Sequence, residues 1–212
     1  MRTGTGVAAE NAARALVSEG ARTLVSFGLA GGLVADASTA TPVVAVAVVS
    51  GAGGWRLDAA APLAAEIEAR TGALYTVARP LVTVVDKRAA RVRTGALAVD
   101  MESAHVLAVA AHHGLPALVV RVVADPVERA LPRLAAVAVR PDGRLAPWAT
   151  ARALALHPRD WPLVALSARD TARARAGLRR AAAGLARLAR QGLLERFLDV
   201  PVEDVGGGAL LG

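Results

Sequence analysis

The sequence contains no cysteine, so disulfide bonds and a thiol nucleophile are both excluded. It also has no apolar run of the roughly 18 residues that a transmembrane helix needs. The longest candidate, "TPVVAVAVVSGAGG", is predicted to be a buried strand. The first residues, "MRTGTGVAAE", lack the charged region, apolar stretch and cleavage site of a secretory signal. A cytoplasmic location is therefore expected.

Aromatic residues make up only 3% of the chain, and a single lysine, Lys87, stands among 25 basic residues. The formal charge of +7 would ordinarily favour nucleic acid as a partner. Surfaces that bind single strands, however, combine basic residues with aromatic side chains that stack on bases. The chain lacks that combination and is rich in alanine, so its arginines indicate a GC-rich coding sequence as readily as a binding surface. No nucleic acid partner is expected.

Hydrophobic residues are abundant, at 54% of the chain, and they form short β-branched runs between helix-forming stretches. This alternation predicts one α/β domain, for which 212 residues are sufficient. We expect a ligand-binding core over 1–126, a mainly helical completion over 127–200 and a loose tail over 201–212. The continuous run Val43–Val49 is typical of a strand that is covered on both faces.

The pattern of apolar residues and glycines predicts the individual elements. Strands are expected at 22–27, 43–49, 75–85, 96–99 and 117–123, and helices at 8–19, 62–70, 102–113, 149–156 and 171–190. Gly20, Gly72 and Gly114 are expected to end three of these helices. Asp160 is a candidate cap for a further helix. The last helix is amphipathic, so we expect its arginines to face solvent while its other face packs on the sheet.

Two carboxylates flank one strand–helix–strand unit: Glu102 precedes its helix and Asp125 follows its second strand. Such crossovers are almost always right-handed and join parallel strands, so both acids are expected at one edge of the sheet, where α/β folds bind ligands. Each acid alone has a structural explanation, as a helix-terminal charge or the start of a turn. The pair favours a site in which one carboxylate binds sugar hydroxyls and the other handles a proton.

Glycine clusters at Gly4 and Gly6, and at Gly28, Gly31 and Gly32, are expected to offer backbone amides to a polar ligand. The "GTG" run is too short for a dinucleotide or Walker fingerprint. A metal site is not expected, because the four histidines form no convincing ligand set, although one of them follows Glu102 by three positions.

The motifs "SFGLAGGL" (26–33), "TGALAVDMES" (94–103) and "VVRVVADP" (119–126) resemble those of the nucleoside phosphorylase and nucleosidase superfamily. The resemblance covers roughly 4–125 and implies a three-layer α/β/α fold with a mixed, largely parallel central sheet. Within the superfamily, "AVDMES", "RVVADP" and "WPLVALSARDTARARAGLRRAA" look most like the hopanoid-associated phosphorylases, which act on adenosylhopane. An enzyme that releases adenine from a 5′-modified adenosine is implied.

The resemblance also implies roles for individual residues. Glu102 would accept hydrogen bonds from the ribose 2′- and 3′-hydroxyls, and Met101 would pack beneath the sugar. Asp125 would donate a proton to, or share one with, N7 of the departing purine. The remaining positions would line the sugar pocket from two sides: Gly28, Leu29, Ala30 and Gly31 on one, and Gly4 and Gly6 on the other.

Three departures from the family pattern affect the choice of nucleophile. The family normally has about two further strands before the first glycine-rich loop, and here Met1 lies almost on that loop, so a misassigned or truncated start is expected. Leu29 and Ala124 stand where relatives often place a serine. Inorganic phosphate as co-substrate and water as nucleophile therefore both stay open, and no cofactor is expected.

Two alternative functions stay open: a methylthioadenosine or adenosylhomocysteine nucleosidase, and a nucleoside-binding protein without activity. The expected partner is a small purine nucleoside. Homo-oligomerisation is expected because absent edge strands would expose the sheet. Peripheral membrane contact through the arginine-bearing helix is a further hypothesis, based on its charge and amphipathicity.

Overall fold

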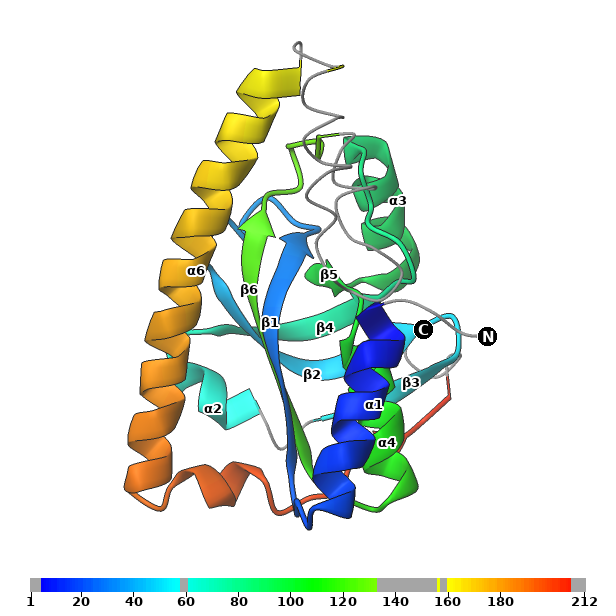
Figure 1. Ribbon diagram of the computed structural model, residues 1–212, viewed down its shortest axis with the longest axis vertical. Helices are drawn as coiled ribbons and strands as arrows, with labels where there is room; N and C mark the ends of the chain where they lie inside the picture. The colour runs from blue at the N-terminus through cyan, green and yellow to red at the C-terminus, as the bar shows by residue number, and fades with distance from the viewer. Residues whose placement is uncertain (1–4, 58–60, 133–155, 157–159, 207–212) are drawn as a thin grey trace.

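The computed structural model describes residues 5–57, 61–132, 156 and 160–206. Within this part, seven strands form one sheet, and helices cover it on two sides (Figure 1). The strands are β1 (Leu24–Gly32), β2 (Pro42–Ser50), β3 (Gly53–Arg56), β4 (Arg70–Thr76), β5 (Ala98–Asp100), β6 (Ala117–Asp125) and β7 (Glu203–Asp204). The helices are α1 (Thr5–Ser18), α2 (Ala61–Glu66), α3 (Val84–Thr94), α4 (Ser103–His112), α6 (Trp161–Arg190) and the 3-10 helix η4 (Leu194–Phe197).

The sheet is mixed, and its two longest ladders, β1 with β6 and β2 with β4, are parallel. Strand order is β4-β5-β1-β6-β2-β3-β7, and β4 also pairs with β2. This extra pairing closes five of the strands into a small barrel, with β3 and β7 as an extension beside β2. The predicted mixed α/β fold is confirmed, and the closure is a feature that strand patterns alone do not reveal.

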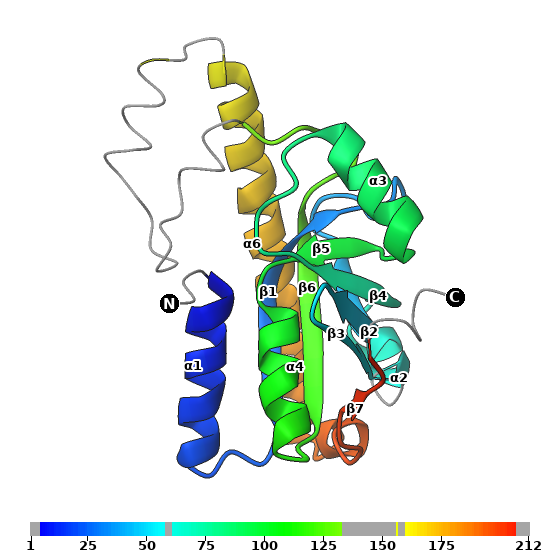
Figure 2. The ribbon, with the colours of Figure 1, turned by 90° about the vertical axis from the view of Figure 1, so that its right-hand side faces the viewer.

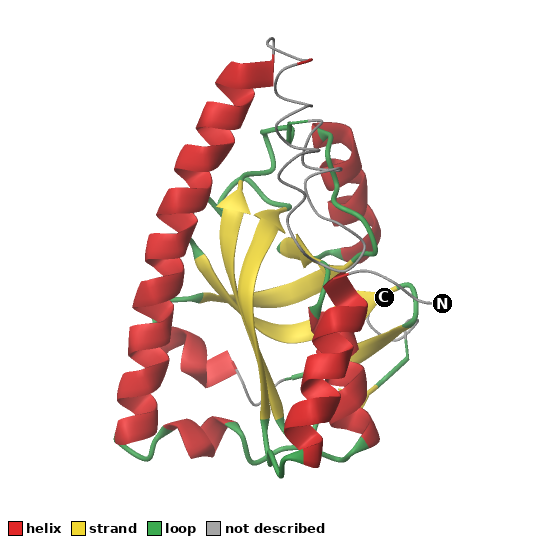
Figure 3. Cartoon of the chain, viewed as in Figure 1, coloured by secondary structure: helices red, strands yellow, loops and turns green. Residues whose placement is uncertain are grey.

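Helices pack on the two faces of β6, as its alternating side chains require. Leu118 and Val120 belong to the cluster that includes Leu188 of α6, whereas Val119 and Val123 belong to the cluster with Leu107 of α4. Figure 2 shows α1 and α4 side by side on one side of the sheet and α6 on the other, and Figure 3 shows the same three layers by element type.

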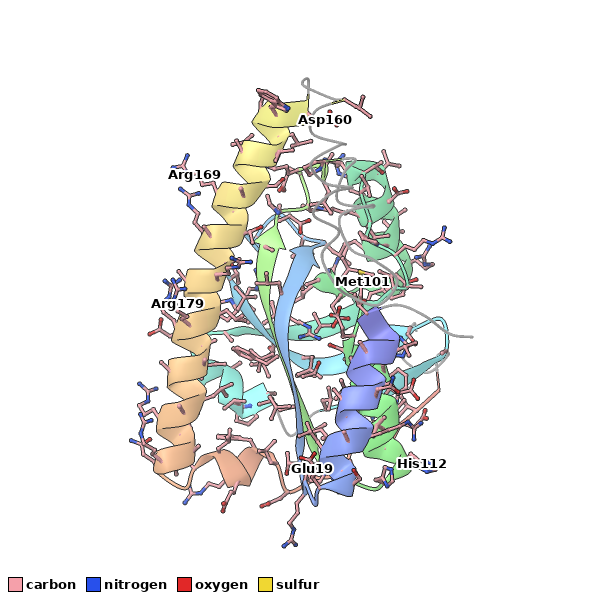
Figure 4. The ribbon with its side chains drawn as sticks, in the orientation of Figure 1. Glu19, Met101, His112, Asp160, Arg169 and Arg179 are labelled. Carbon is pink, nitrogen blue, oxygen red and sulfur yellow. The ribbon has the colours of Figure 1, made fainter. Side chains whose placement is uncertain are left out.

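Helix α6 is one continuous helix of 30 residues. The sequence analysis predicted two helices here, one capped by Asp160 and one over 171–190, and no residue breaks the helix between them. Asp160 does precede it, but its side chain makes no capping hydrogen bond. Buried positions such as Ala174, Gly177 and Ala181 follow one face, and the arginines are exposed, so the predicted outward orientation is confirmed. Arg169 and Arg179 point away from the sheet in Figure 4.

Two local predictions are wrong, and a third is not tested. Gly72 does not end a helix, because the chain is already in β4 from Arg70 onward. The expected strand 75–85 ends at Thr76, and Val84 begins α3, which Thr83 caps by accepting a hydrogen bond from the Asp86 amide. The expected helix 149–156 lies outside the described residues except for Leu156. Within the described residues, no helix is long and apolar enough to cross a membrane.

The strands that flank α4 are also not parallel, contrary to the crossover prediction. β5 runs antiparallel to β1 while β6 runs parallel to it, and β1 lies between them. The rule for right-handed crossovers applies only where two strands of a sheet are parallel. Here α4 instead connects strands that point in opposite directions around the closed barrel.

Close packing between α6 and the sheet depends on Gly177, which gives a first prediction. A Cβ at this position would lie 2.8 Å from the Ala40 carbonyl oxygen and 3.0 Å from Val122 Cγ1. Gly177→Ala should therefore destabilise the protein by roughly 1–3 kcal/mol through overpacking, less the ~1 kcal/mol that alanine contributes to helix propensity. Urea unfolding measures the change.

Gly184→Ala is the matched control, because Gly184 lies in the same helix and its replacement by alanine gives the same gain in helix propensity. Its Cβ would meet a side-chain atom, Ile67 Cγ2 at 2.9 Å, which can shift more easily than a backbone carbonyl. A Gly177→Ala protein as stable as the Gly184→Ala protein would contradict the packing account.

Candidate functional site

The two carboxylates singled out by the sequence line the same cavity. Its volume is about 210 Å³, and Glu102 and Asp125 both contribute to its wall. Other predicted residues that line it are Leu29, Ala30, Gly31 and Met101. Apolar side chains from the segment between β4 and α3, namely Val77, Pro80 and Leu81, complete one side. The structure therefore brings together most of the predicted site residues.

The acids meet although their strands are not parallel, because β5 is short and lies beside the end of β1. Gly31 pairs with Val99 of β5 on one side and with Asp125 of β6 on the other. From Val99 the chain turns back along β1 and delivers Met101 and Glu102 to the same region. Figure 4 labels Met101, which in that view lies beside the first turn of α1. The two acids thus lie close together as expected, but their strands, β5 and β6, run in opposite directions.

Glu102 is at the N-cap position of α4, yet its side chain makes no capping hydrogen bond. Glu102 is therefore not explained by capping of the helix. Its carboxylate keeps 34% exposure and lies 3.8 Å from Arg121 Nη2. Burial raises the pKa of Glu102, the Arg121 guanidinium opposes that rise, and the nearby Asp100 carboxylate reinforces it.

Asp125 ends β6, and its side chain is only 16% exposed. Oδ2 accepts a hydrogen bond from the ammonium of Lys87, a fully buried residue on α3. Burial raises the pKa of the Asp125 carboxyl, while the charges of Lys87 and Arg129 act to lower it. A carboxyl whose pKa is raised in an apolar pocket is suited to donate a proton near neutral pH.

Arg121 and Asp100 form a buried ion pair next to Glu102. Arg121 Nε donates to Asp100 Oδ2 at 2.8 Å, and Nη2 donates to Ser26 Oγ at 2.8 Å and to Ser103 Oγ at 3.0 Å. Asp100 also accepts from Thr76 Oγ1 at 2.6 Å. The pair therefore links β6, β5, β1, β4 and the start of α4 at the position where Glu102 leaves the sheet.

The sequence analysis did not select Lys87, Arg121 or Asp100 as site residues. All three are buried, and charged side chains are almost never fully buried unless they are paired, so their burial in the structure marks them as members of specific ion pairs. One sequence signal existed for Arg121, which interrupts the otherwise apolar run of β6. Lys87 was missed because no helix was predicted over α3, whose first two residues were assigned to the expected strand 75–85.

Gly28 and Gly31 lie against charged side chains of β6. A Cβ on Gly28 would lie 2.7 Å from Arg121 Nη1, and a Cβ on Gly31 would lie 3.2 Å from Asp125 Oδ2. These glycines make room for the charged side chains of β6. Gly6 lies in α1 rather than in a loop, and its missing side chain accommodates the ring of His105. Gly4 lies outside the described residues.

A second cavity, of about 290 Å³, adjoins the first at Glu102. It lies between α1 and β1, and Ala9, Ala13 and Phe27 are among its apolar lining residues. Gly28 lines this cavity and not the first, together with Ser26 and Arg121. The Glu102 carboxylate thus borders both cavities. At about 290 Å³ the second is just below the usual volume of small-molecule sites, roughly 300–1,000 Å³, and the first, at about 210 Å³, is smaller.

Residues 55–139 match the family model described as the Phosphorylase superfamily. This region contains both Glu102 and Asp125, and the match supports the superfamily resemblance of the sequence motifs. No curated protein matches the sequence.

Solved structures share the fold. A 5′-methylthioadenosine/S-adenosyl homocysteine nucleosidase from Helicobacter pylori aligns with 20% identity and a TM-score of 0.54 over 59% of this chain and 65% of that one. A second structure of that enzyme, with butyl-thio-DADMe-Immucillin-A, aligns with 16% identity and a TM-score of 0.58 over 88% and 77% of the two chains. A futalosine hydrolase mutant from Helicobacter pylori aligns with 20% identity and a TM-score of 0.51 over 57% and 66%.

In the first and third alignments the chain spans just under two thirds of the relative's own length. At these identities the likeness concerns the fold. The protein has the α/β fold of nucleoside phosphorylases and nucleosidases, with an acid pair in the cavity beside its closed sheet.

The buried ion pair gives a second prediction. Arg121→Met leaves Asp100 as a buried carboxylate without a cation, which should cost about 3–5 kcal/mol. Adding Asp100→Asn removes the uncompensated charge, so the double variant should regain part of that loss. Urea unfolding of the single and double variants measures both effects.

Arg14→Met is the control for this experiment, since it breaks an exposed ion pair with Glu10. Exposed pairs of this kind contribute about 0–1 kcal/mol. If Arg121→Met cost no more than Arg14→Met, the network around Asp100 would not stabilise the fold.

A third prediction concerns Glu102 and pH. Because its pKa is raised in the folded state, its contribution to stability is present below the unfolded pKa and is lost as pH rises through the folded value. Glu102→Gln should therefore gain stability relative to the wild type as pH rises from about 4 to about 7, across the ordinary carboxyl pKa of roughly 4.3. Thermal melts at both values test this, with the exposed Glu19→Gln as control. An unchanged difference between Glu102→Gln and wild type would contradict it.

Proposed function

We propose that the protein cleaves the N-glycosidic bond of a purine nucleoside, a 5′-modified adenosine, and releases adenine. The observation that carries the proposal is the shared cavity of Glu102 and Asp125, two carboxyls that burial and different cationic neighbours place in different electrostatic settings. Such a pair can divide two tasks, one carboxylate binding sugar hydroxyls and one carboxyl transferring a proton.

In this reaction Asp125 gives its proton to N7 of the purine as the bond to C1′ breaks. The base then leaves without the negative charge that would otherwise develop on it, and this general-acid step contributes a factor of roughly 10²–10⁴. Glu102 holds the ribose 2′- and 3′-hydroxyls, which fixes the sugar while it acquires oxocarbenium character. Met101 packs against the sugar from the cavity wall.

The nucleophile approaches on the side of Arg121. Arg121 Nη1 lies over Gly28, next to the second cavity, and makes no hydrogen bond to any described residue. A guanidinium nitrogen in this position can bind either a phosphate oxygen or the oxygen of water, and Glu102 lies beside it to accept a proton. Phosphate and water are both compatible with this arrangement.

A fourth prediction tests the function directly. The protein is incubated with adenosine and with methylthioadenosine, with and without inorganic phosphate, and free adenine and the corresponding sugar 1-phosphate (ribose or methylthioribose 1-phosphate) are measured. Adenine release from both phosphate-containing and phosphate-free mixtures indicates hydrolysis. Release that requires phosphate and yields the sugar phosphate indicates phosphorolysis. Preference for methylthioadenosine over adenosine would support the nucleosidase alternative.

Asp125→Asn and Glu102→Gln should each lower the rate of adenine release by roughly 10²–10⁴. The matched controls are Asp199→Asn and Glu19→Gln, both at exposed positions away from the cavity. Saturable nucleoside binding without adenine release would favour the non-catalytic alternative. The adenosylhopane substrate, the homo-oligomer and the contact of α6 with membrane stay predictions of the sequence.

A further inference from the structure

Lys87 is the one lysine of the chain, and it is fully buried. Its ammonium has three N–H donors. One donates to Asp125 Oδ2, and the other two donate to the carbonyl oxygens of Pro126 and Arg129, each at 2.9 Å. All three donors are therefore satisfied by the short segment 125–129, which begins with the proposed acid.

The helix that carries Lys87 is well anchored. Thr83 caps its start, and Gly95 at φ 63° closes its end, with the Gly95 amide donating to the Arg91 carbonyl. Ala90, one turn after Lys87, packs in a cluster with Leu33 and Val99. Because α3 is fixed at both ends and along its buried face, the position of the lysine ammonium is determined by the helix and not by the cavity.

We propose that Lys87 is a positioning residue for the proposed N-glycosidic cleavage, which holds Asp125 Oδ2 and the backbone of 126–129 so that Oδ1 faces the purine. This inference rests on the function proposed above. In the reaction the proton on Asp125 passes to N7 of the leaving base, and the electron pair of the broken O–H bond stays on the carboxylate. The Lys87 ammonium neutralises the carboxylate that forms and keeps its own three protons.

Other charged groups near this pair come from each neighbouring element. Arg129 follows β6 and pairs with Asp170 of α6. Glu102 lies across the cavity beside Arg121 and Asp100, and Asp86 on α3 bonds to Thr83. Of these, Glu102 is the group whose own titration has to be separated from that of Asp125, since both carboxyls line one cavity.

The single lysine makes a direct experiment feasible. Protein labelled with ¹⁵N-lysine gives one side-chain ammonium resonance, that of Lys87, which can be followed during a pH titration. We expect its shift to change in a step when Asp125 titrates, with a midpoint above the ordinary aspartate pKa of roughly 3.9, because burial raises the pKa of Asp125. The step should persist in Glu102→Gln and vanish in Asp125→Asn.

A resonance without such a step, or a step that survives Asp125→Asn, would overturn the proposal. This titration needs no catalysis, so it stands even if the wild-type protein releases no adenine. Failure of the proposed function and failure of the Lys87 inference are thereby distinguished.

Where the wild type is active, Lys87→Met should lower kcat about 100-fold, with KM within about threefold, because the acid loses its alignment and its counter-charge. The pH profile of kcat should also shift upward, since Asp125 keeps its proton to higher pH without the ammonium. Lys87→Gln, which retains a hydrogen-bond donor without the charge, should show the same shift with a smaller loss of rate. Arg88→Met, an exposed neighbour on the same helix, is the matched control. Unshifted profiles in both Lys87 variants would overturn the counter-charge role.

Discussion

The ion pair between Arg121 and Asp100 is the interaction on which the site depends. Both side chains are almost completely buried, so each would be strongly destabilising without the other. Through Ser26, Ser103 and Thr76 the pair connects the strands on either side of β1 with the start of α4. It therefore fixes the point at which the chain leaves β5 and presents Met101 and Glu102 to the cavity.

A second cation, Lys87, has the corresponding role for the other acid. Burial raises the pKa of Glu102 and of Asp125 alike, but Arg121 opposes the rise at one and Lys87 with Arg129 at the other. The two carboxyls thus have separate counter-charges on separate elements. This separation allows each group to hold its own protonation state within one small cavity, which is what a division between sugar binding and proton transfer requires.

The elements that the sequence predicted well are those with a strong internal pattern. The β-branched run of β2, the glycine-ended helix α1 and the apolar strand β6 each have periodicity and a stop signal within a few residues. The prediction failed at the start of α3 for the opposite reason, because "VTVV" has the composition of a strand, whereas in the structure Thr83 caps a helix whose Lys87 pairs with Asp125. Tertiary contacts decided that segment.

The site was predicted only in part for a similar reason. Acids next to strand ends are visible in a sequence, so Glu102 and Asp125 could be named. Of the cations beside them, only Arg121 has a sequence signal, as an arginine within an apolar strand. The roles of Gly28 and Gly31 were likewise hidden, because the need for glycine arises from side chains of β6 that approach β1 across the sheet. The direction of β5 also depends on closure of the barrel, which is a long-range pairing between β4 and β2.

The apolar lining of the first cavity follows from the same arrangement. Leu29 and Ala124 line this cavity together with Asp125, and neither side chain carries a hydroxyl. Without such hydroxyls the acid is less well solvated, which favours its protonated form and its function as a donor. The side chains of the same two residues cannot bind an anion.

Of the polar groups that the structure describes around both cavities, Arg121 is therefore best placed to hold a nucleophile. Selection between phosphate and water then falls to the space around its Nη1, between α1 and β1, where the lining is apolar apart from Ser26 and Glu102. An ionised Glu102 would repel a phosphate dianion at that position, whereas the Arg121 guanidinium would attract it, so phosphate and water both stay open as nucleophiles.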